Sequence, residues 1–119
     1  MRRLFLLGLA LTLGCGDFGS HPGGTLDAVP DQVLYEPHIR EITTRYCVEC
    51  HIDPPRNGAP DYFRLDQYED DANGKLGVLN MADAIRAVTV IDYMPKGRTP
   101  LSQIEKDTIA RWIAQRERW

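Results

Sequence analysis

The sequence predicts an all-α fold of about three to five short helices. Apolar residues recur at helical spacing in three segments of the chain. Ser102 and Glu105 form the serine–glutamate pair that is typical of a helix N-terminus. No segment alternates apolar and polar residues with the two-residue period of a β-strand. We therefore expect helices that are joined by loops, and no sheet.

Each expected helix has a beginning or an end that the sequence marks. Pro37 suits the first turn of a helix, and apolar residues at helical spacing continue that helix to about Cys47. A second helix is expected over about 80–91, with Asn80 as its N-cap. The third is expected to begin at Ser102 and to run to the C-terminus with a broad apolar face.

The segment 52–75 separates the first two helices and is rich in proline, glycine and aspartate. We expect short helical pieces here, wrapped around a cofactor, rather than strands. Four side chains would supply apolar walls for that cofactor, although ordinary core packing explains each of them singly just as well. They belong to Tyr62, Phe63, Leu65 and Tyr68.

The N-terminus has the pattern of an export signal. Two arginines precede a mainly apolar run over 4–13, which is too short to span a bilayer and suits a signal peptide over 1–14. Cys15 then follows a small residue, in a pattern that resembles the lipobox of bacterial lipoproteins, where the cysteine is acylated. Thr12 departs from that pattern, which usually has leucine there. The alternative is ordinary cleavage nearby, with Cys15 free or removed.

Residues 15–33 are predicted to form a flexible tether, because glycines and prolines lie there among polar side chains. The folded domain is then expected over 34–119. Lipidation of Cys15 would make this an exported, periplasmic domain that is anchored to a membrane. The formal net charge of −3 does not indicate a nucleic-acid-binding protein.

One pentapeptide carries most of the functional information, and it reads Cys47-Val48-Glu49-Cys50-His51. The pattern Cys-x-x-Cys-His is the attachment signature of a c-type haem. The two thiols can add to the two vinyl groups of one porphyrin. His51, as the next residue, is placed to bind the iron as its proximal ligand. The pentapeptide therefore predicts one covalently bound haem c.

Three other uses of these residues are a redox-active pair, a zinc site and a structural disulfide. A thioredoxin-like Cys-x-x-Cys pair belongs near a strand–helix–strand pattern, which the sequence does not contain. A zinc site would need a fourth ligand beyond Cys47, Cys50 and His51, from another histidine, Cys15 or a carboxylate. A structural disulfide would not need His51.

The sixth ligand of such an iron is expected to be Met94. Met1 belongs to the predicted signal peptide, and Met81 falls inside a predicted amphipathic helix, where core packing is the better interpretation. Met94 is expected in a loop, because the following Pro95 disfavours a helical conformation at the residue before it. A thioether ligand favours reduced iron and raises the reduction potential relative to two histidines.

The order of these features resembles class I cytochromes c. The resemblance covers about 40–119 and rests on a helix, the haem pentapeptide, the Met94–Pro95 loop and a terminal helix that contains Trp112. It implies a small class I cytochrome c fold wrapped around one covalent haem. It also implies that the first and last helices cross, and that His51 and Met94 bind opposite faces of the haem.

The function expected from the sequence is electron transfer rather than enzyme catalysis. Iron would cycle between Fe(III) and Fe(II), with redox proteins as donor and acceptor and with no small-molecule substrate. An alternative is a haem enzyme or ligand sensor with a displaceable sixth ligand, for which a distal acid–base group would be needed. His38 is the only other histidine near the folded core. A zinc-binding module is the third possibility.

Overall fold

The computed structural model describes residues 26–116. Its helical elements are the π-helical turn η1 (Tyr35–Ile39), α1 (Arg40–Tyr46), α2 (Val78–Val90) and α3 (Gln103–Arg116). Within the described residues there is no β-strand, and only an isolated parallel bridge joins Phe63 to Leu76. The expectation of an all-α fold is thus confirmed for this part of the chain. The predicted signal peptide and Cys15 lie outside it.

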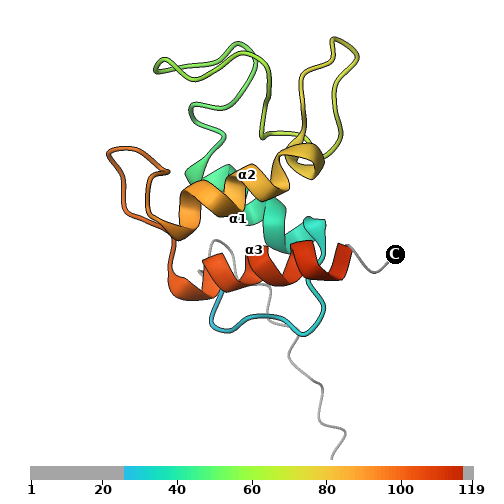
Figure 1. Cartoon of the computed structure of the whole chain (residues 1–119), viewed down its shortest axis with the longest axis vertical. Helices are drawn as coiled ribbons and strands as arrows, with labels where there is room; N and C mark the ends of the chain where they lie inside the picture. Colours follow the sequence, from blue (N-terminus) through green and yellow to red (C-terminus); the bar gives the residue numbers. More distant parts are fainter. Residues whose placement is uncertain (1–25, 117–119) are drawn as a thin grey trace, which may run out of the picture.

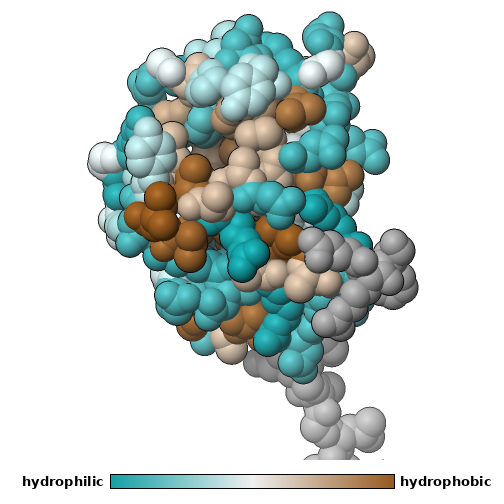
Figure 2. Space-filling model, in the orientation of Figure 1, coloured by the Kyte–Doolittle hydropathy of each residue, from teal (hydrophilic) through white to brown (hydrophobic). Residues whose placement is uncertain are grey.

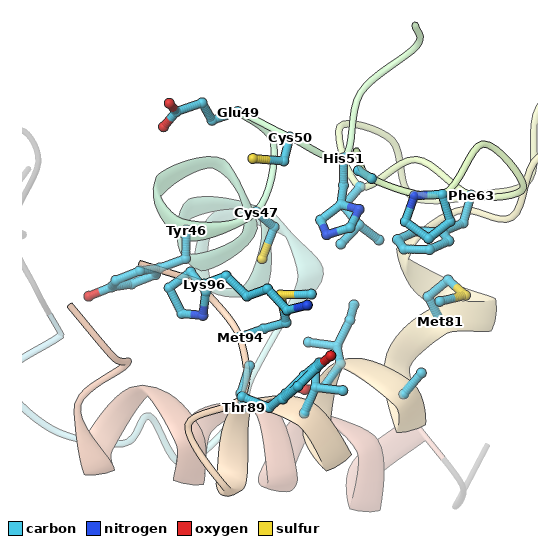
Figure 3. Close-up of a pocket in the computed structure, with 18 of the residues that line it drawn as sticks. Tyr46, Cys47, Glu49, Cys50, His51, Phe63, Met81, Thr89, Met94 and Lys96 are labelled. Carbon is cyan, nitrogen blue, oxygen red and sulfur yellow. Dashed lines mark hydrogen bonds between the residues drawn. The ribbon is translucent and has the colours of Figure 1, made fainter. Parts of the chain in front are cut away.

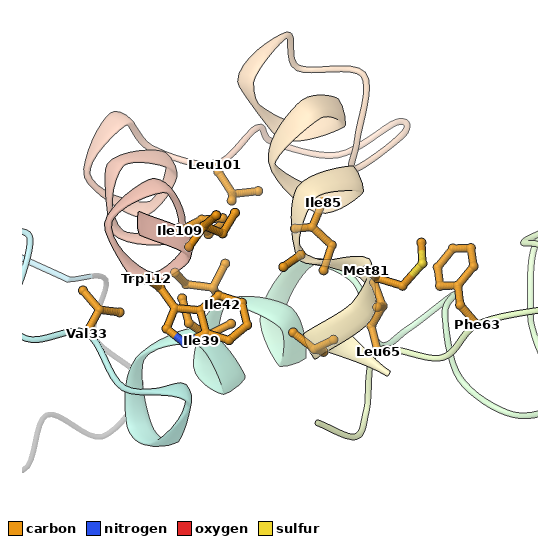
Figure 4. Close-up of a cluster of buried hydrophobic side chains, with 13 residues drawn as sticks. Val33, Ile39, Ile42, Phe63, Leu65, Met81, Ile85, Leu101, Ile109 and Trp112 are labelled. Atoms are coloured by element: carbon orange, nitrogen blue, oxygen red, sulfur yellow. The ribbon is translucent and has the colours of Figure 1, made fainter. Parts of the chain in front are cut away.

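Figure 1 shows α3 between α2 on one side and the segment that leads into η1 on the other. Both α2 and η1 pack against α3. Among the residues described, no helix has the length and apolar character needed to cross a membrane. Buried apolar side chains of the helices and of the neighbouring loops form one core (Figure 4), which comprises Val33, Ile39, Ile42, Phe63, Leu65, Val78, Met81, Ala82, Ile85, Leu101, Ile109, Trp112 and Ile113.

The N-terminus of α3 is capped as the sequence predicts. The Ser102 hydroxyl accepts a hydrogen bond from the Glu105 backbone N–H at 3.2 Å, and the Glu105 carboxylate accepts one from the Ser102 N–H at 2.8 Å. This reciprocal pair satisfies two backbone donors that the first turn of a helix otherwise leaves unpaired. The last helix therefore begins where the serine–glutamate pair places it.

Replacing Ser102 by alanine should lower the free energy of unfolding by about 1 kcal/mol, because the N–H of Glu105 loses its acceptor. Chemical denaturation followed by circular dichroism measures the change. Ser102→Asp is the matched control, since aspartate caps a helix about as well as serine. Equal destabilisation by both variants would contradict the capping role.

The beginning of α2 differs from the expectation, since Gly77 and not Asn80 is its N-cap residue. Backbone carbonyls of Gln67 and Tyr68 in the preceding loop accept from the first two N–H groups of α2, at 3.0 and 2.9 Å, and Asp70 accepts from the Gly77 N–H at 2.9 Å. A Cβ at Gly77 would lie 2.3 Å from the Glu69 carbonyl oxygen, so only glycine allows this approach. The prediction for Asn80 was wrong because the helix begins earlier, where the loop carbonyls accept its first N–H groups.

The described segment between α1 and α2 contains no helix, so the expected short helical pieces over 52–75 are not present. Turns and bends replace them, in keeping with the prolines, which cannot donate backbone hydrogen bonds. Charged side chains hold these turns together. Lys75 Nζ contacts carboxylate oxygens of Asp53 at 2.7 Å and Asp61 at 2.6 Å, and Arg64 Nε donates to Asp66 at 2.8 Å.

The described part of the predicted tether, residues 26–33, lies along α3 (Figure 1). The Gln115 side chain accepts from the Val33 N–H at 2.9 Å and donates to the Asp31 carbonyl at 2.7 Å. Arg111 donates to the Pro30 carbonyl at 2.9 Å. Val33 is also buried in the core, so the packed domain begins before residue 34.

Candidate functional site

A cavity of about 660 Å³ opens between the loop after α1, the turns around residue 60, one face of α2 and the loop before α3 (Figure 3). Its volume lies within the range of ligand and cofactor pockets. Most of the surface that faces it is apolar. The cavity therefore has the size and character of a site for an apolar cofactor.

The four predicted site residues all line this one cavity, and they are Cys47, Cys50, His51 and Met94. Cys47 caps the C-terminus of α1, with its N–H bonded to the Thr43 carbonyl at 2.8 Å. Its own carbonyl accepts from the N–H groups of Cys50 at 3.2 Å and His51 at 2.9 Å. The pentapeptide thus forms a tight turn that presents both thiols and the imidazole to the same space.

His51 is buried, and its environment favours the form that binds metals. Burial lowers the pKa of the imidazole, which keeps the ring neutral at physiological pH. The ring stacks on Phe63, with 4.7 Å between the ring centroids. Its Nδ1 atom has no hydrogen-bond partner among the described residues. A buried neutral imidazole in an apolar cavity is suited to ligate a metal centre.

The two thiols of the pentapeptide are free and lie in different surroundings. Burial raises the pKa of the Cys47 thiol to about 12. The Cys50 sulfur accepts a hydrogen bond from the Asn57 side-chain amide at 3.3 Å. A thiol with the pKa of Cys47 stays protonated at neutral pH and is a weak nucleophile.

Met94 reaches the cavity from the loop that follows α2. The N–H groups of Tyr93 and Met94 both donate to the Val88 carbonyl, at 3.0 and 3.1 Å, and so fold the loop back onto the last turn of the helix. Met94 is half-buried and Pro95 lines the cavity beside it. In Figure 3, Met94 and His51 come from separate loops and share the same space.

Met81 is a second methionine in the wall of the cavity. It belongs to the core, as the sequence indicates, because α2 buries it beside Phe63 and Leu65 (Figure 4). Among the described residues, two thioether side chains nevertheless line this cavity, those of Met81 and Met94. Any test of Met94 therefore requires a matched change at Met81.

The expected apolar walls are present in part. Tyr62, Phe63 and Leu65 line the cavity, whereas Tyr68 turns away and packs on Tyr35, with 4.5 Å between ring centroids. Sequence reasoning missed the wall that α2 contributes through Ile85, Val88 and Thr89, and the contributions of Tyr46 and Leu101. The apolar face of α2 was visible in the sequence, but nothing there showed what it faces.

His38 is not part of the cavity wall. Its Nδ1 atom accepts a hydrogen bond from the Leu34 backbone N–H at 3.0 Å, which holds the turn at the start of η1. Among residues 26–116, no three His, Cys, Asp or Glu side chains gather in a group that could hold a metal ion.

Comparisons with protein-family models, with curated proteins and with solved structures found no match to this chain.

Proposed function

We propose that this chain is a single-haem c-type cytochrome that carries electrons, with the small class I cytochrome c fold. The observation that carries the proposal is the meeting of four residues in one apolar cavity. The haem-attachment residues Cys47, Cys50 and His51 meet Met94 there, although Met94 belongs to a different loop. Covalent attachment, a histidine ligand and a thioether ligand are the three requirements of such a site.

Each residue has a distinct role in this proposal. Cys47 and Cys50 would hold the porphyrin through thioether bonds, and His51 and Met94 would ligate its iron. A bound haem would supply one-electron exchange between Fe(III) and Fe(II). The burial of His51 favours the neutral ligand form, and the cavity walls are mainly apolar.

The two alternatives receive less support from the geometry. A peroxidase-like enzyme needs an acid–base group on the distal side. His51 is the only histidine that lines the cavity within the described residues, and His38 is engaged with the backbone at Leu34. A zinc module needs several donors around one point, and the described part of the chain brings no such group together.

The proposal includes a cellular setting. The signal peptide over 1–14 and lipidation of Cys15 would place the domain in the periplasm, anchored to a membrane. Its partners would be a donor and an acceptor redox protein. Mass spectrometry of the membrane fraction tests this setting, because an N-terminal diacylglyceryl cysteine would identify Cys15 as the first mature residue.

Haem attachment tests the proposed function directly. Produced together with a haem-attachment system, the protein should gain the mass of one haem and should keep it after denaturation in acid. The double variant Cys47→Ser/Cys50→Ser should lose that mass, because hydroxyl groups do not form the thioether bonds. Val48→Ala is the control within the pentapeptide and should retain the haem. A wild-type protein that releases all its haem on denaturation would overturn the proposal.

A further inference from the structure

Three large apolar side chains are exposed together where α2 ends. Val90 is 57% exposed, Ile91 72% and Tyr93 53%, and they lie within four consecutive residues. Apolar side chains gather on this side of the molecule, over the end of α2 and the loop that follows it (Figure 2). Single exposed apolar residues are ordinary, but a contiguous patch indicates an interaction site. We call these three residues the α2-end patch.

The α2-end patch is continuous with the proposed cofactor site. Tyr93 belongs to the patch and also lines the cavity, and the next residue is Met94. Hydrogen bonds from both N–H groups to the Val88 carbonyl tie this part of the loop to α2. A molecule that covers the patch would therefore lie against the loop that carries Met94.

Two cations border the patch. Arg86 precedes Val90 by four residues on α2, so the two share a helix face. Lys96 Nζ lies 4.6 Å from the centroid of the Tyr93 ring. Neither cation has an ion-pair partner among the described residues, whereas the nearby Asp92 is paired with Lys106 at 2.6 Å. The rim of the patch is thus positive, although the chain carries a net charge of −3.

We propose that the α2-end patch is the docking surface for a redox protein whose own contact face is acidic around an apolar centre. This inference rests on the proposed electron-carrier function. The apolar centre would exclude water at the contact, and Arg86 and Lys96 would orient the partner and accelerate the encounter. A patch of three exposed side chains fits the small, transient contacts of electron-transfer complexes. Its continuity with the Met94 loop favours a redox protein over a lipid surface.

The experiment uses a gold electrode coated with a mixed monolayer of carboxylate-terminated and methyl-terminated alkanethiols, which reproduces an acidic face with an apolar component. Voltammetry of the haem-loaded protein measures the redox-active coverage. Ile91→Ser and Arg86→Glu should each reduce binding, and Ile91→Ser by about tenfold, since burial of one large aliphatic side chain can provide that factor. Leu34→Ser and Arg40→Glu are the matched controls, because both residues are exposed and lie outside the cavity.

A selective loss in the two patch variants, together with weak coverage on an amine-terminated monolayer, would support the proposal. Equal coverage for patch and control variants would overturn it. Sedimentation with vesicles of phosphatidylcholine and phosphatidylserine is the second arm, and binding lost in the same two patch variants would assign the patch to a membrane instead. An optical redox titration in solution tests the proposed electron-carrier function separately, because it requires haem but no docking. A normal titration together with equal coverage would reject the docking surface alone.

Discussion

Replacing Met94 by alanine should lower the reduction potential of the haem-loaded protein by on the order of 0.1–0.2 V, a fraction of the roughly 0.8 V that axial ligands span. The thioether sulfur stabilises reduced iron, so its removal favours the oxidised state. The weak long-wavelength absorption band of methionine–iron ligation should disappear from the oxidised spectrum. The open position should then bind carbon monoxide in the reduced state. Potentiometric titration and absorption spectroscopy measure these effects.

Met81→Leu is the control that the cavity provides. Met81 lines the same space, and leucine preserves its volume and apolar character within α2. The band and the potential should survive this change. Loss of the band in Met81→Leu, with retention in Met94→Ala, would transfer the ligand role to Met81. A wild-type protein that is already high-spin and binds carbon monoxide would favour the sensor or enzyme alternative.

The sequence was most informative where a feature depends on neighbouring residues. The capping box needs only Ser102 and Glu105, three residues apart, and the structure forms it as predicted. The turn of the pentapeptide is similarly local, since the Cys47 carbonyl bonds to the third and fourth residues after it. Short-range patterns of this kind keep their meaning in any fold that leaves the segment intact.

Features that depend on contacts between distant residues could not be predicted from the sequence. Asn80 is a good capping residue, but Gly77 takes the N-cap position, because carbonyls of the preceding loop accept from the first N–H groups of α2. The aromatic side chain of Tyr68 was suited to a cavity wall, yet it packs on Tyr35. In both cases tertiary packing overrode the local preference on which the prediction rested.

Glu105 has a second role, in contacts between α1 and α3, which the capping-box pattern does not show. Beyond its part in the capping box, its side chain is 1% exposed and accepts a hydrogen bond from the Tyr46 hydroxyl at 3.0 Å. Arg45 lies 3.3 Å from the same carboxylate. Burial, together with the hydrogen bond to Glu105, raises the pKa of Tyr46. Since Tyr46 also lines the cavity, this buried carboxylate joins α1 to α3 directly behind the proposed haem site.

Replacing Glu105 by alanine should lower the free energy of unfolding of the haem-loaded protein by about 2–4 kcal/mol, because a buried charge-assisted network loses its common acceptor. The Tyr46 hydroxyl and the Ser102 N–H would each lose a partner, and the partly exposed Arg45 would recover some solvation. Denaturant titration followed through the haem absorption measures the loss. Asp107→Ala, on the exposed side of the same helix, is the control and should change stability by no more than about 0.5 kcal/mol. A cost for Glu105→Ala as small as that of the control would show that the side-chain network between α1 and α3 does not stabilise the fold.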